Sequence, residues 1–190
     1  MRNNFILLVF AILSFGLLFW VKSSDQEDLR RKKLANHKPQ EYMRHAFVTI
    51  FSESGSLKNE LSAKYWAYLP DAELSILTLP HLSIYKPDGS IWLIDAKKGR
   101  VKQPTIGNIE QLELQDEVVI ERPETKTTIP LKLETTELNY YPKKEFAESE
   151  QWVVMNKPGL KMTGVGLRAY LNQGSMELLR DVKTYYTVTR

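Results

Sequence analysis

The residue types that most often carry catalysis or bind metals are few and far apart in this chain. The 190-residue sequence has no cysteine, which excludes disulfides, thiolate nucleophiles and cysteine-based zinc sites. Its three histidines, His37, His45 and His81, do not have the spacing of a metal-ligand motif. We interpret each of them as a surface or strand-end residue.

Motifs of common enzyme classes are also missing. The sequence has no nucleophile elbow, no phosphate-binding glycine loop and no HExxH pair. Carboxylate pairs such as Asp95 with Glu113 leave an enzyme acting on envelope glycans as an open alternative, although their spacing does not favour it. We predict that the protein is not an enzyme and needs no cofactor.

Charge argues against a nucleic-acid partner. The formal net charge is only +3, and basic residues are interleaved with acidic ones along the chain. A nucleic-acid binder is expected to gather its basic residues on one continuous face.

Apolar residues follow the two-residue period of β-strands. Between residues 112 and 121 the even positions are mostly apolar and the odd positions mostly charged or polar, which predicts one buried and one solvated face. Runs of this kind, separated by Pro, Gly, Asn or Asp, occupy residues 46–51, 57–69, 72–79, 81–85, 90–96, 110–121, 130–141, 151–155, 160–167 and 176–189. Pro80 and Gly99 are among the predicted turn positions. Many short strands at regular spacing predict an all-β sandwich or jellyroll.

The amino-terminal segment has a different character. Residues 5–21 carry no charge and are long enough to span most of a bilayer as a helix. We predict a membrane anchor at residues 1–22, a polar tether at 23–41 and a β-domain at 42–190. A cleaved signal peptide is the main alternative, although the small-x-small cleavage site is missing. The basic residues after the anchor conflict with export of the domain under the positive-inside rule.

The carboxy-terminal third carries a family resemblance. The sequence PGLKMTGVGL at residues 158–167 is followed by MELL at 176–179 and VKTYY at 182–186. These stretches resemble the LptC family of lipopolysaccharide export proteins. Further similarities in the same order occur at Gly55 and at residues 77–80, 92–96, 112–114 and 135–138. Asp116 departs from the family, which commonly has glycine there, but Asp tolerates a left-handed conformation and so we expect a bulge there.

The resemblance implies a single-pass protein of the cell inner membrane whose twisted β-jellyroll domain lies in the periplasm. Such a protein would receive lipopolysaccharide from a transporter formed by LptB, LptF and LptG, and would pass it to LptA. The rival hypothesis is a membrane-tethered scaffold that binds only proteins, through the same carboxy-terminal strand edge.

We predict three sets of residues with a binding or structural role if this resemblance holds. Inward apolar positions predicted to contact lipopolysaccharide are Ala46, Val48, Leu77, Leu114, Leu138, Met162 and Met176. Positions predicted to form an edge strand that pairs with LptA are Val182, Thr184, Tyr186 and Val188. Glycines predicted to be structural are Gly55, Gly159, Gly164 and Gly166. From the pattern alone, an ordinary filled core is the favoured interpretation of these inward residues.

Overall fold

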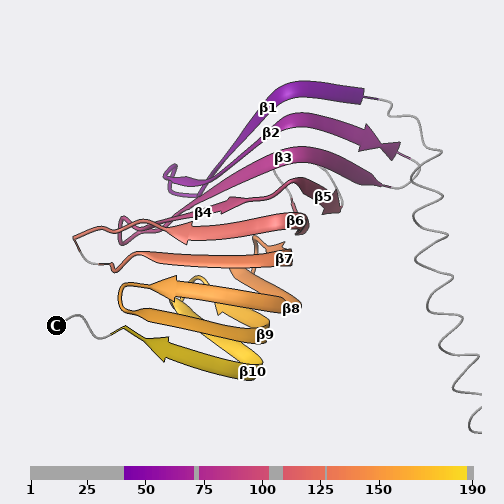
Figure 1. Ribbon diagram of the computed structural model, residues 1–190. Helices are drawn as coiled ribbons and strands as arrows, with labels where there is room; N and C mark the ends of the chain where they lie inside the picture. The colour runs from indigo at the N-terminus through magenta and orange to yellow at the C-terminus, as the bar shows by residue number, and fades with distance from the viewer. Residues whose placement is uncertain (1–40, 71–72, 103–108, 127, 188–190) are drawn as a thin grey trace, which may run out of the picture. The chain divides into compact units, whose positions relative to one another are not determined.

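The computed structural model describes residues 41–70, 73–102, 109–126 and 128–187 (Figure 1). The predicted anchor at residues 1–22 and the tether as far as residue 40 lie outside these ranges. No helix within the described ranges is long and apolar enough to cross a membrane.

The described chain forms one antiparallel sheet of ten strands, which confirms the all-β prediction. Its strands are β1 (Glu41–Phe51), β2 (Leu57–Leu69), β3 (Leu74–Tyr85), β4 (Ile91–Asp95), β5 (Lys98–Lys102), β6 (Gln111–Arg122), β7 (Leu131–Tyr141), β8 (Phe146–Lys157), β9 (Leu160–Tyr170) and β10 (Ser175–Tyr186). Figure 1 shows them following one another in chain order from β1 to β10. Since each strand pairs mainly with its sequence neighbours, short connections suffice.

Strands β4 and β5 together occupy one position in this order. Both lie between β3 and β6, with β4 paired along one half of these neighbours and β5 along the other. The break between them falls at Ala96 and Lys97, where the chain changes direction. One long strand has in effect been divided in two at a corner.

The other strands bend at the same level. Several non-glycine residues in the strands adopt positive φ, and register shifts interrupt the ladders of β6 through β10. The strand residues with positive φ are His45, Leu79, Asp116, Glu117, Gly166 and Asp181. Local bends and bulges of this kind let a sheet turn a corner. The sheet therefore folds over on itself along one line that crosses the strands.

Asp116 illustrates how a corner is made. Its φ is 62° and that of Glu117 is 51°, and the pairing of β6 with β7 shifts between Gln115 and Val118. Two residues of β6 thus stand opposite one residue of β7, which is a β-bulge. The bulge predicted at Asp116 is confirmed.

The inner face of the folded sheet encloses a single apolar core. Its members come from every strand except β10, which contributes the partly buried Met176 and Leu178. The predicted alternation of β6 is confirmed, because Leu112, Leu114, Val118 and Ile120 are all buried.

Two predicted turns were wrong. Pro80 lies inside β3, where its carbonyl accepts from the Ala96 amide at 3.2 Å, next to the break between β4 and β5. A residue without an N–H is tolerated where the ladder is already interrupted. Gly99 lies inside β5, and a Cβ there would come within 3.1 Å of the Pro80 Cγ. Gly99 is therefore a close-packing position.

An ionic clasp ties the β7–β8 turn to distant parts of the sheet. The Glu145 carboxylate in this turn lies 3.5 Å from the Lys58 ammonium in β2 and also pairs with the Lys86 ammonium after β3. The Glu145 carbonyl accepts from the Leu171 amide at 2.8 Å. Burial disfavours the charged carboxylate, but the Lys86 and Lys58 ammoniums outweigh this effect and lower the pKa of Glu145.

The first prediction concerns this clasp. We expect Glu145→Gln to lower the free energy of unfolding by about 1 kcal/mol at pH 7, since solvent screens a partly exposed pair. A carboxylate whose pKa is lowered by folding stabilises the fold above its unfolded pKa of about 4.3 and loses this effect as pH falls through the folded pKa. Urea unfolding at pH 7 and pH 3 should show a smaller difference from the unmodified protein at pH 3 than at pH 7. Glu117→Gln is the control, because the Glu117 pair with Lys97 is largely exposed and should matter less. An equal deficit at both pH values would contradict the ionic explanation.

The second prediction concerns Gly166 at the corner of β9. Its φ is +81°, and a Cβ there would lie 2.9 Å from Leu179 Cδ1 and 3.2 Å from Leu179 Cβ. Gly55 has the same φ but no atom within 4 Å of such a Cβ. Gly55→Ala should cost about 1 kcal/mol from backbone strain alone, and Gly166→Ala about 2–4 kcal/mol because overpacking is added. Equal losses in urea unfolding would show that the contact with Leu179 is unimportant.

Candidate functional site

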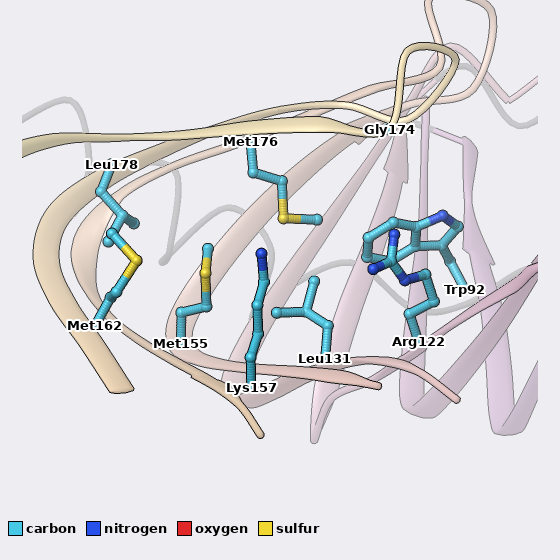
Figure 2. Close-up of a pocket in the computed structure, with 9 residues that line it drawn as sticks. All are labelled: Trp92, Arg122, Leu131, Met155, Lys157, Met162, Gly174, Met176 and Leu178. Atoms are coloured by element: carbon cyan, nitrogen blue, oxygen red, sulfur yellow. The ribbon is translucent and has the colours of Figure 1, made fainter. Parts of the chain in front are cut away.

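A cavity of about 150 Å³ lies where the folded-over part of β10 covers strands from the middle of the sheet. Figure 2 shows Met176 extending from the strand above toward Met155, Lys157 and Leu131, which rise from the strands below. The lining residues are Trp92, Arg122, Leu131, Met155, Lys157, Met162, Gly174, Met176 and Leu178. The cavity is thus enclosed from two sides by one folded sheet.

Methionine dominates the apolar wall of the cavity. Met155 in β8 and Met162 in β9 are directly paired across the two strands, and Met176 faces the cavity from β10. These are three of the five methionines in the chain. Methionine is flexible and polarisable, so such a wall can adapt to guests of different shape.

Two cations complete the lining. The Arg122 guanidinium lies 5.1 Å from the centroid of the Trp92 ring, a favourable cation–π distance. Lys157 stands between Met155 and Leu131 with its ammonium directed into the same space (Figure 2). The lining of the cavity therefore combines apolar side chains with two positively charged ones.

The predicted lipid-contacting residues divide into two groups. Met162 and Met176 line the cavity. The other five lie away from it: Ala46, Leu77, Leu114 and Leu138 are buried in the core, and Val48 is partly buried against it. Leu77 is 0% exposed, so side chains fill the space around it. Their contact with lipid stays a prediction.

The carboxy-terminal strand lies at one edge of the sheet. Among the described strands, β10 pairs only with β9. Val182 is 45% exposed, Tyr186 is 77% exposed and Thr184 is also exposed, whereas Val188 lies outside the described residues. This part of β10 presents apolar side chains and an unpaired backbone edge together, a combination that invites strand addition.

The described residues do not gather a metal-binding cluster. No cluster of three or more histidine or carboxylate side chains that could hold a metal occurs among them. Asp95 pairs with His81 at 2.7 Å, and Glu113 pairs with Lys102, so these two carboxylates have separate partners. The His81 side chain, within β3, is 42% exposed and so reaches the surface, as predicted.

The sequence interpretation missed the cations of the cavity. Arg122 continues the even-numbered inward series of β6 beyond Ile120, and Lys157 continues the inward series of β8 beyond Met155. Arg122 and Lys157 could therefore have been found in the sequence as the next inward position of β6 and of β8. A charged residue at the end of a strand is usually assigned to solvent, which is why periodicity alone did not single them out.

Comparison with known proteins agrees with this architecture. The sequence matches the family model described as lipopolysaccharide-assembly, LptC-related over residues 6–187. The fold is similar to the crystal structure of LptH, the LptA homologous periplasmic component of the lipopolysaccharide transport device from Pseudomonas aeruginosa. That likeness has a TM-score of 0.55 and 9% identity, and covers 68% of this chain and 95% of that chain.

At this identity the likeness to LptH shows the fold alone. No curated protein sequence matches the chain. The family model, by contrast, extends over nearly the whole sequence. The protein therefore belongs to the lipopolysaccharide-assembly, LptC-related family.

Proposed function

We propose that this protein carries lipopolysaccharide between components of the export system. The acyl chains of the lipid would bind inside the folded sheet, which would form a β-jellyroll. Family membership supports the role in lipopolysaccharide transport. The observation that supports this binding site is the methionine-lined cavity beneath β10.

The physical basis is burial of acyl chains. Apolar surface gains about 25 cal/mol for each Å² removed from water. A wall of flexible methionines offers many similar contacts and few directional ones, so a chain can move along it without entering a deep energy minimum. Such a site suits a carrier better than a tight receptor.

Acyl chains would enter at the cavity and continue toward Leu138 and Leu114 as the overlying strands move away. These two residues are 1% exposed, so separation of the layers is part of the proposal. The glycine and bulge corners of β9 and β10 are the places where such a movement would begin, because they already interrupt the ladder.

We further propose that the chain spans the inner membrane once, with the β-domain in the periplasm. The uncharged residues 5–21 support an anchor, and the family resemblance supports the orientation. The anchor would contact the transporter formed by LptB, LptF and LptG, and β10 would pair with LptA.

A scaffold that binds only proteins is the second candidate. The tight packing of Leu77 and Leu114 favours it, because a closed core takes up no lipid. Uptake of a hydrophobic dye that lipopolysaccharide displaces would support the carrier function. Failure of the folded protein to take up either would support the scaffold.

The third prediction tests lipid contact. A photo-crosslinking residue at Met176 should capture lipopolysaccharide in cells, since this side chain faces the cavity. Glu177 is the matched control, because it is the next residue of β10, exposed on the other face. Capture at Glu177 equal to that at Met176 would exclude the cavity as the binding site.

The fourth prediction tests strand addition at β10. The Thr187 amide donates to the Gly159 carbonyl at 2.9 Å, so alternation directs the Thr184 amide toward the free edge. Thr184→Pro should weaken binding to LptA at least about ten-fold by removing this donor, while Thr184→Val should bind normally. Affinity would be measured by titration with purified LptA. Unchanged binding by the proline variant would place the LptA contact elsewhere.

A further inference from the structure

Two apolar rows on the inner face end in a positive charge. Along β6 the buried Ile120 is followed on the same face by Arg122, and along β8 the buried Met155 is followed by Lys157. Both cations line the cavity. The change from apolar to cationic therefore occurs at the same end of two strands.

The sheet register brings these cations into one row. Arg122 pairs with Leu131 in β7, and Lys157 lies one step beyond the pair of Asn156 with Lys132. Arg122 and Lys157 thus flank Leu131 from the two neighbouring strands. Their backbones are separated by two strand spacings, roughly 10 Å, which two long side chains directed into the same space can bridge through one anion.

Arg122 is held in place but has free donors. Stacking on the buried Trp92 ring orients the guanidinium, and one terminal nitrogen donates to the Ile129 carbonyl at 3.1 Å. Its Nε is buried and has no hydrogen-bond partner among the described residues. A buried donor of a charged group is costly to leave unpaired, so an acceptor in the cavity would be bound favourably.

The described residues do not neutralise this positive charge. Within the described part of the chain neither Arg122 nor Lys157 forms an ion pair, whereas Lys132, on the outer face of the neighbouring strand, lies 3.1 Å from Glu134 and 3.8 Å from Glu121. Lys132 on the outer face is thus compensated by carboxylates, whereas Arg122 and Lys157 are not. Arg122 lies against the buried Trp92, where apolar surroundings strengthen its attraction for an anion, whereas Lys157 is exposed.

We propose that Arg122 and Lys157 bind a phosphate group of the amphiphile whose acyl chains occupy the methionine cavity. This inference rests on the proposed function and assigns the polar end of the ligand to particular residues. The guanidinium can donate two parallel hydrogen bonds to phosphate oxygens, and the ammonium adds a point charge from the far side of Leu131. Phosphate binding would hold the lipid in one orientation while its chains stay mobile.

The fifth prediction uses the full-length protein in detergent. Phosphorylated lipid A should bind more tightly than the same lipid after removal of its phosphates. Lys157→Gln and Arg122→Gln should each weaken binding of the phosphorylated lipid about ten-fold and weaken binding of the dephosphorylated lipid much less. Lys132→Gln is the matched control on the outer face and should bind both lipids normally.

The remaining comparisons keep the outcome unambiguous. Arg122→Lys retains the charge and should lose less affinity than Arg122→Gln, which separates loss of charge from loss of packing on Trp92. Inorganic phosphate at matched concentration should not displace the lipid; tight binding of phosphate alone would overturn the assignment to an amphiphile. Equal binding of both lipids by the unmodified protein would overturn the phosphate site and leave acyl-chain binding intact. Binding of neither lipid would instead count against the proposed function.

Discussion

The fold depends on one geometric constraint: the strands must bend at the same level. Apart from the short β4 and β5, each strand is long enough to contribute to both layers, so a single long strand that continued straight would separate them. Residues with positive φ at His45, Leu79, Asp116 and Asp181, together with the break between β4 and β5, meet this requirement. Left-handed conformations cost energy outside glycine, and burial of a continuous apolar face offsets that cost. The core and the cavity both exist because the sheet folds over.

This constraint also explains what sequence could predict about the fold. Alternation identified nearly every strand, and the predicted run 57–69 coincides with β2. It failed at Pro80 and Gly99, because both residues are usual turn formers. In this fold both residues lie where the sheet bends. Pro80 lies beside the break between β4 and β5, and Gly99 allows close packing against Pro80. Composition alone does not distinguish a corner within a sheet from a turn that ends a strand.

The candidate site was predictable only in part, for a different physical reason. Periodicity shows which side chains point inward, but not whether the opposite layer fills the space in front of them. Leu138 and Met176 share the inward orientation, yet Leu138 is packed in the core and Met176 faces a cavity. That difference arises from how far the overlying part of β10 stands from the strands below, which depends on contacts between residues distant in sequence. The edge position of β10 was easier to predict, because a last strand in chain order has few possible partners.

The cavity is apolar on its inner side and positively charged at its margin. Inward positions of β6 and β8 are apolar up to Ile120 and Met155 and cationic at Arg122 and Lys157, while carboxylates such as Glu134 stay on the outer face. The apolar interior can therefore contact the acyl chains of an amphiphile while the cations at the margin contact its phosphates. The buried Arg122 Nε has no acceptor among the described residues, which is unfavourable for stability alone, whereas the exposed Lys157 carries no such cost. The unpaired Arg122 donor is the feature that the proposed binding of an anionic amphiphile would explain.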